Sequence, residues 1–202
     1  VDVDVTFTNS TMITGGDTGI SSTTGTTVLT DVTGTAGGSF SVAGAGDMTL
    51  TNLTLTTGAD VSIDTEANLV STGNTITAGG DTSLTALTDV SLSNLILVGG
   101  GNLKVDAEQG NLTADTLELT VSGEEVIFNS AVNTLITNTA NVFNTTVVNI
   151  TAGGTLDVSD STFDVEGDVN LTVGGDVTLG ANGMDIEGSL TGTFGSSLEA
   201  TG

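Results

Sequence analysis

A unit of about 21 residues recurs in this sequence, most clearly over residues 149–202. Asn149–Val169 aligns with Asn170–Leu190 without a gap, so that NITAGG falls on NLTVGG and FDVEG falls on MDIEG. A unit this short cannot bury an apolar face by itself, and it becomes stable only by stacking on further copies. The repeat therefore predicts a rod built of similar layers.

Apolar and polar residues alternate within the unit. Val1, Val3, Val5 and Phe7 are separated by aspartate and threonine, and the longest alternation runs over residues 163–173. Strict alternation predicts β-strands that bury one face and expose the other to water. Val, Ile and Thr supply many of these positions, and all three favour strands. No segment of ten or more residues carries a convincing helical apolar stripe, so we expect essentially no helix.

Pairs of adjacent glycines recur at related intervals. They begin at residues 15, 37, 79, 99, 153 and 174, and most intervals are close to one or two units of 21 residues. Glycine permits the positive φ of a sharp bend, and the absence of proline leaves every strand N–H able to donate. The interval from 99 to 153 does not fit, which predicts either three shorter coils or an irregular stretch near 130–148.

Stacked units of two or three short strands predict a parallel β-solenoid (a β-helix) of about nine or ten coils. Each strand would pair with its equivalent one coil further on, ~4.8 Å away. We expect residues 1–202 to form a single solenoid domain. A β-sandwich is the alternative, because it explains the alternation, but it does not explain a repeat that keeps its register. The solenoid requires Phe163 and Met184 to lie side by side in adjacent coils.

The composition excludes most catalytic chemistry. The chain has no His, Cys, Trp or Tyr, and Lys104 is its single basic residue against 25 acidic ones, giving a net charge of −24. Activated serine or cysteine nucleophiles, ordinary zinc sites and phosphate clamps cannot be built from this set. Paired carboxylates alone can cleave glycosides, but the basic and aromatic residues that hold sugars are missing. We therefore expect no enzyme, and we expect Lys104 to screen Asp106.

The style of the repeats resembles a known group of proteins. Residues 78–94, 110–120 and 167–190 read AGGDTSLTALTDVSLSN, GNLTADTLELT and GDVNLTVGGDVTLGANGMDIEGSL. These segments are similar to the right-handed β-helix shafts of filamentous-haemagglutinin-like surface proteins. The resemblance implies secretion, a long surface fibre and a role in adhesion or contact. The secretion domain of that family is not recognisable here, so the resemblance extends to the shaft alone.

Stacked carboxylates form a candidate cation site. In the repeat register Asp164 aligns with Asp185 and Glu166 with Glu187, which places four carboxylates on the outer surface. Like charges directly opposite each other are destabilising, and Ca²⁺, which prefers hard oxygen ligands, would relieve the repulsion. The alternative is a solvated acidic face screened by salt. No other cofactor is expected. Lesser acidic pairs are Asp2 with Asp4 and Glu124 with Glu125.

Six N-x-[ST] sequons are candidates for glycosylation, which would suit an exterior protein. Two of them, Asn149 and Asn170, stack in the repeat register and would equally suit an amide ladder. The six are Asn9, Asn52, Asn111, Asn144, Asn149 and Asn170.

Threonine rows suggest a different kind of surface. Flat arrays of outward threonines on a solenoid can bind ice, provided that the same positions recur coil after coil on one face. Outward candidates are Thr49, Thr51, Thr54 and Thr56. Along the sequence threonine looks scattered, so β-propensity and solubility are the simpler explanation.

The functional hypotheses follow from the repeat at the two ends of the sequence. The alternation already runs at Val1 and the repeat still runs near Gly202, so we expect uncapped strand edges, which template pairing with other chains. The leading hypothesis is a non-enzymatic, secreted structural subunit that self-assembles into an extracellular filament, tube or sheath. The alternatives are a shaft fragment of a large cell-surface adhesin and, third, an ice-binding solenoid.

These hypotheses fix the partners and the location that we expect. The partners are copies of the chain itself or flanking repeats of a longer chain. A net charge of −24 repels nucleic acid and anionic lipid, so we expect neither nucleic-acid binding nor membrane insertion. The acidic, cysteine-free composition suits the exterior of a bacterium or archaeon.

Overall fold

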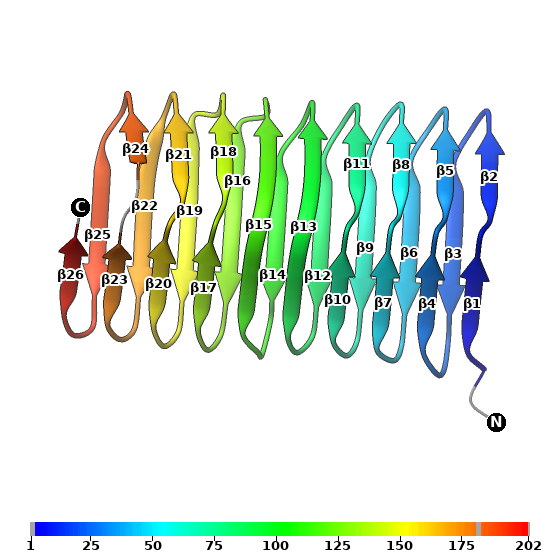
Figure 1. Ribbon diagram of the computed structural model, residues 1–202, viewed down its shortest axis with the longest axis horizontal. Coiled ribbons are helices and arrows are strands. Elements are labelled where there is room, and N and C mark those ends of the chain that lie inside the picture. Colours follow the sequence, from blue (N-terminus) through cyan, green and yellow to red (C-terminus); the bar gives the residue numbers. More distant parts are fainter. Residues whose placement is uncertain (1–2, 181–182, 202) are drawn as a thin grey trace.

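The chain is a rod of stacked β-coils (Figure 1). The computed structural model describes residues 3–180 and 183–201, which contain the strands β1 to β26 and no helix. Within this described part, therefore, no helix is long and apolar enough to cross a membrane. The two ends of the chain lie at opposite ends of the rod.

Each coil contributes to three ladders along the rod, with three separate strands in most coils and two in the fifth and sixth. Equivalent strands of successive coils pair in parallel. The first ladder contains β1 (Val5–Thr8), β4 (Thr27–Thr30), β7 (Met48–Thr51), β10 (Leu69–Thr72), β13 (Val90–Gly99), β15 (Leu112–Val121), β17 (Thr134–Thr137), β20 (Leu156–Ser159), β23 (Val177–Gly180) and β26 (Leu198–Thr201).

The second and third ladders complete the coils. The second contains β2 (Thr11–Thr14), β5 (Thr33–Ala36), β8 (Thr54–Thr57), β11 (Thr75–Ala78), the later halves of β13 and β15, β18 (Ala140–Phe143), β21 (Thr162–Val165) and β24 (Gly183–Ile186). The third contains β3 (Thr18–Ser22), β6 (Phe40–Gly44), β9 (Val61–Thr65), β12 (Thr82–Ala86), β14 (Leu103–Ala107), β16 (Glu125–Ser130), β19 (Val147–Ala152), β22 (Asp168–Val173) and β25 (Leu190–Phe194).

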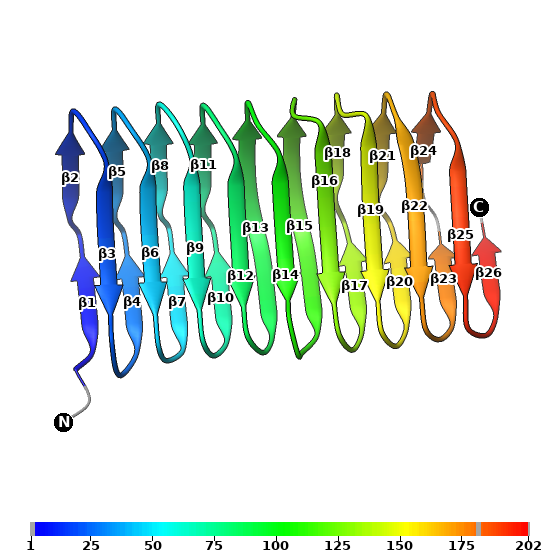
Figure 2. The ribbon, with the colours of Figure 1, turned by 180° about the vertical axis from the view of Figure 1, so that it is seen from behind.

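The first two ladders form one 17-stranded sheet because β13 and β15 run through both, and the third ladder is a 9-stranded sheet. The nine strands of the third ladder close nine coils, and β26 begins a tenth. In Figure 1 the strands of the first two ladders rise at the front while the coils advance to the left. Figure 2, from behind, shows the third ladder descending while the coils advance to the right. The solenoid is therefore right-handed, as parallel crossovers usually are.

The register of the ladders confirms the predicted solenoid. Phe163 of β21 pairs with Met184 of β24 in the next coil, as the 21-residue alignment requires. The coil that begins at Val90 is 22 residues long, so that Val90 pairs with Leu112. The extra residue lies in a corner: residues 108–111 connect β14 to β15, whereas residues 87–89 connect β12 to β13. Insertions in the corners leave the strand register intact.

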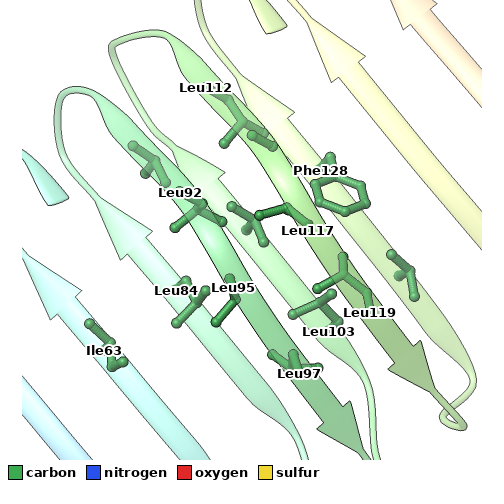
Figure 3. Packing of buried hydrophobic residues seen from close by; sticks show 14 of the residues in the cluster. Ile63, Leu84, Leu92, Leu95, Leu97, Leu103, Leu112, Leu117, Leu119 and Phe128 are labelled. Atoms are coloured by element: carbon green, nitrogen blue, oxygen red, sulfur yellow. The ribbon is translucent and has the colours of Figure 1, made fainter. Parts of the chain in front are cut away.

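The core is a set of apolar columns that run the length of the rod. Leu55, Ile76, Leu97 and Leu119 follow one another in paired strands of four successive coils, and all are almost completely buried. Figure 3 shows leucines of neighbouring coils packed against each other in this interior. Burial of such surface stabilises the fold by roughly 25 cal/mol per Å². Each coil therefore depends on the coils above and below it for its stability.

All six phenylalanines lie in this core or against it. Phe143 sits between Phe128 and Phe163, with ring centroids 6.4 Å and 6.1 Å apart in tilted and edge-on arrangements, and such contacts add to the effect of burial. The other three are Phe40, which is buried, and Phe7 and Phe194, which pack against the core from partly buried positions.

The glycine pairs lie in two different corners of the coil. This explains why the interval between the pairs at 99 and 153 did not fit the repeat. The glycine pairs at 15, 37 and 79 lie in the corner between the second and third ladders, whereas those at 153 and 174 lie in the corner between the third and first. The stretch near 130–148 contains β17 and β18 in full register with their neighbours.

The long alternation over 163–173 is likewise divided between two strands. Gly167 separates β21 from β22 at a corner, and a Cβ there would collide with the backbone of Thr146 in the preceding coil. Glycine is required at this position because two corners stack at close range.

Truncation of the central ring should destabilise the rod strongly. We expect Phe143→Ala to lower the free energy of unfolding by about 3–5 kcal/mol, because it removes a buried ring held between two others. Val142→Ala on the outer face of the same strand is the matched control, with an expected loss of about 1 kcal/mol or less. Urea unfolding followed by circular dichroism measures both, and equal losses would contradict the assigned core.

Candidate functional site

The corner between the first and second ladders turns through one left-handed residue in each of the first eight coils. These residues have φ between 48° and 56° where they are not glycine, and Gly73 takes the position in the fourth coil with φ 68°. Asn and Asp tolerate this conformation better than other side chains, whereas the β-branched Thr116 is strained there. The set is Asn9, Asp31, Asn52, Gly73, Asn94, Thr116, Asn138 and Asp160.

Side chains at the corner between the third and first ladders form an axial chain of hydrogen bonds. Asp89 Oδ1 accepts from the backbone N–H of Asn111 at 2.8 Å and from its Nδ2 at 3.1 Å. Asn111 Oδ1 in turn accepts from Asn133 Nδ2 at 3.2 Å, and Asn133 Oδ1 accepts from the N–H of Thr155 at 2.9 Å. Each side chain thus binds its own coil to the next one.

A similar axial chain of hydrogen bonds occurs at the corner between the second and third ladders. Asp60 Oδ1 accepts from the N–H of Asp81 at 2.9 Å, and Asp81 Oδ1 accepts from the N–H of Asn102 at 2.7 Å. Asn102 Oδ1 then accepts from the N–H groups of Glu124 and Glu125. Many of the acidic residues are therefore structural acceptors, because they bind backbone N–H groups that the corners leave outside the ladders.

Three aspartates, Asp4, Asp115 and Asp176, have a pKa below the ordinary value because hydrogen bonds favour their charged form. The N–H and then the hydroxyl of Thr26 lower the pKa of Asp4. The amide of Asn138 and then the hydroxyl of Thr137 lower the pKa of Asp115. Asp176 has its pKa lowered by the hydroxyl and then the N–H of Ser197.

The candidate calcium ligands lie where the repeat alignment placed them. Asp164 and Asp185 are in register on the exposed outer face of β21 and β24, and Glu166 and Glu187 follow these strands on the surface. Within residues 3–180 and 183–201, no three acidic side chains are grouped closely enough to hold a metal ion. Calcium binding stays a prediction.

The lesser acidic pairs and the single lysine have other partners. Asp2 lies outside the described residues, Asp4 accepts from Thr26, and Glu125 accepts from Asn149 Nδ2 at 2.7 Å. Lys104 Nζ lies 2.9 Å from Asp106 Oδ2. The predicted screening of Asp106 by Lys104 is confirmed.

Four of the six sequon asparagines donate their side-chain amides to the neighbouring coil. Asn170 Nδ2 donates to Asn149 Oδ1 at 3.0 Å, so the amide ladder that their alignment suggested is present. Asn52 donates to Asp31, and Asn111 donates to Asp89. Glycosylation of any sequon stays a prediction. The remaining two, at exposed positions, are Asn9 and Asn144.

Threonine looks scattered along the sequence, but the structure aligns it in columns on one face, so the expectation of scattered threonines was wrong for this surface. On the second ladder Thr33, Thr54 and Thr75 pair in successive coils, and Thr35, Thr56 and Thr77 form a second column beside them. We call the outward residues of this ladder in the first five coils the threonine face. It consists of Thr11, Ile13, Thr33, Thr35, Thr54, Thr56, Thr75, Thr77, Ile96 and Val98.

Sequence reasoning missed the buried polar residues of the rod, and Asn74 is an example. Asn74 is 1% exposed, its Oδ1 accepts from the N–H of Leu53 at 2.6 Å, and its Nδ2 donates to the carbonyl of Leu50 at 3.1 Å. It occupies the inward position that Leu53 and Leu95 take in the adjacent coils, and Gly73 supplies the left-handed turn. The signal in the sequence is the order GNT, where the neighbouring coils have NLT and NLI.

Comparison of the chain with protein-family models, curated proteins and solved structures found no match.

The lowered pKa of Asp115 predicts a pH-dependent contribution to stability. A depressed folded pKa stabilises the fold above the ordinary aspartate value of about 3.9, and this contribution is lost as the pH falls through the lowered value. We therefore expect Asp115→Asn to lower the melting temperature at pH 6 and to have little effect near pH 2. Thermal denaturation across this range measures the difference.

Asp164→Asn is the matched control, with the opposite sign. It removes a like-charge pair with Asp185 in the next coil, so it should raise the melting temperature at pH 6 and have little effect in acid. A pH-independent difference between Asp115→Asn and the wild-type chain would contradict the role of Asp115.

Proposed function

We propose that the chain is a non-enzymatic structural rod whose terminal coils pair with coils of further copies, forming an extracellular filament, tube or sheath. The observation that carries the proposal is the exposure of core positions at the end of the rod. Leu190 and Leu198 are each 51% exposed, whereas their partners one coil earlier, Val169 and Val177, are 6% and 1% exposed. Another coil laid on this end would bury them.

The backbone at this end supports axial pairing. The N–H of Val169 donates to the carbonyl of Ser189 in the next coil at 2.8 Å. Leu190 stands at the equivalent position of β25, and the described residues contain no third-ladder strand beyond β25. An unpaired strand edge of this kind templates a further strand. The hydrogen bonds that hold each coil to the next can therefore continue into another molecule.

The corner side chains support the same direction of growth. Asp176 Oδ1 accepts from the hydroxyl of Ser197 at 2.7 Å and from its N–H at 3.1 Å. Ser197 is the last member of this corner column in the described part of the chain, and its hydroxyl oxygen can accept from an N–H of an adjoining coil. Lateral association is opposed by the net charge of −24, because like-charged surfaces repel.

The alternative is a shaft segment of a cell-surface adhesin, as the resemblance to filamentous-haemagglutinin-like proteins implies. Its terminal coils would then be covered by coils of the same polypeptide. Both proposals place the rod outside a bacterial or archaeal cell, and both rest on axial continuation. They differ in whether separate copies of this chain join.

Charges placed on the exposed end should block joining. We expect the wild-type chain to form rods longer than one molecule, and the double variant Leu190→Lys, Leu198→Lys to stay monomeric, because each lysine stands where the next coil would pack. The control is Thr162→Lys, Thr172→Lys, which adds the same charge on the outer faces of β21 and β22. Sedimentation velocity and negative-stain microscopy measure the assembly. A monomeric wild-type chain at high concentration would contradict self-assembly.

Assembly should also depend on ionic strength. The Debye length falls from about 30 Å at 0.01 M to about 8 Å at 0.15 M salt, so added salt screens the repulsion between acidic coils. We expect sodium chloride to promote assembly, and calcium to promote it further if the aligned carboxylates bind it. The Asp164→Asn, Asp185→Asn variant should lose only the calcium increment. Assemblies that survive a chelator at low ionic strength would refute this dependence.

A further inference from the structure

The threonine face presents a regular net of β-branched side chains. Along the rod, Thr35, Thr56 and Thr77 follow one another in paired strands, at a spacing of ~4.8 Å. Along each strand the two outward residues are two positions apart, or ~6.6 Å. Figures 1 and 2 show the strands of this ladder running nearly parallel from coil to coil. The net therefore repeats in two directions.

The side chains of this net are stiff and chemically uniform. Threonine, isoleucine and valine have restricted χ1 rotation, so little conformational freedom remains to be lost on binding. Every residue of the face offers a methyl group, and the threonines add a hydroxyl. Ile96 and Val98 continue the methyl pattern in the fifth coil and are 44% and 47% exposed. Clustered apolar groups with this exposure mark interaction surfaces.

The residues of the threonine face carry no charge. None of its ten residues is ionisable, although the chain carries a net charge of −24. The acidic residues on the outer side of the same ladder come later, at Glu118, Asp164 and Asp185. An uncharged face on a strongly acidic rod suits a neutral partner, because no ionised group must be desolvated there.

The residue types argue against a protein or a sugar as that partner. Protein hot spots are rich in Trp, Tyr and Arg, and the chain contains no Trp or Tyr. Its phenylalanines lie in or against the core, so they offer no ring for stacking on a sugar. A partner that matches a stiff, neutral net must itself repeat in two dimensions and form hydrogen bonds with hydroxyls.

We propose that the threonine face binds the surface of ice. Ice is neutral, and the rows of oxygen atoms on its faces repeat at spacings close to those of the net. The hydroxyls of the threonines can take the place of lattice waters, while the methyl groups between them order or displace the remaining water. The proposal concerns one side of the rod and does not depend on axial assembly at its ends.

The experiment compares two single charge insertions in the same coil. Thr56→Lys places a long, hydrated side chain at the centre of the threonine face. Ser62→Lys places the same charge on the exposed outer face of β9 in the third ladder. Thermal hysteresis, the shape of single ice crystals and inhibition of ice recrystallisation are measured for the full chain and both variants. Circular dichroism verifies that each variant is folded.

We expect the wild-type chain and Ser62→Lys to shape ice and show hysteresis, and Thr56→Lys to lose both activities while remaining folded. Thr56→Val, which keeps the methyl groups, should retain most of the activity. A folded wild-type chain that neither shapes ice nor inhibits recrystallisation overturns the proposal. Equal loss in Thr56→Lys and Ser62→Lys overturns it as well. Sedimentation that shows a lateral dimer dissociated by Thr56→Lys would instead assign the face to a second copy.

Discussion

The parallel pairing of each strand with its equivalent one coil further on is the interaction on which this structure depends. It satisfies the backbone of every strand inside the rod, aligns apolar side chains into columns such as Leu55–Ile76–Leu97–Leu119, and fixes which outward residues become neighbours. No coil can do this alone, because the few short strands of one coil enclose too little apolar surface. The stability of the rod is therefore distributed between neighbouring coils.

The acidic composition has a structural use within this arrangement. At two corners, aspartate and asparagine accept backbone N–H groups from the next coil, as Asp89 does from Asn111 and Asp81 from Asn102. In the corner column Asp47, Asn68, Asp89, Asn111, amides alternate with carboxylates, so like charges are not adjacent. The same acids leave the rod surface strongly negative. The faces without acids, above all the threonine face, are therefore the places where contacts can form without electrostatic cost.

The proposals of axial assembly and of ice binding concern different surfaces of the rod. Axial joining uses the ends of the rod, where Leu190 and Leu198 expose core surface. Ice binding uses one side, where the residues are uncharged and repeat in two directions. The adhesin alternative changes only the source of the adjoining coils, which would then belong to the same polypeptide. A rod of this kind can lengthen axially and still present its side faces, because the two surfaces do not overlap.

The repeat, the alternation and the register of the last coils could be predicted from the sequence because they are local patterns. The pairing of Phe163 with Met184, for example, follows from counting 21 residues. The sequence also placed Asn149 beside Asn170 and Lys104 beside Asp106. The alignment of the other coils could not be predicted in this way and follows from the folded chain, because corners take up extra residues, as residues 108–111 do. Glycine pairs mark two different corners, and the threonine columns appear only after this alignment. Side chains distant in sequence become neighbours because the strands that carry them pair through backbone hydrogen bonds. A local sequence pattern does not show which corner contains an inserted residue.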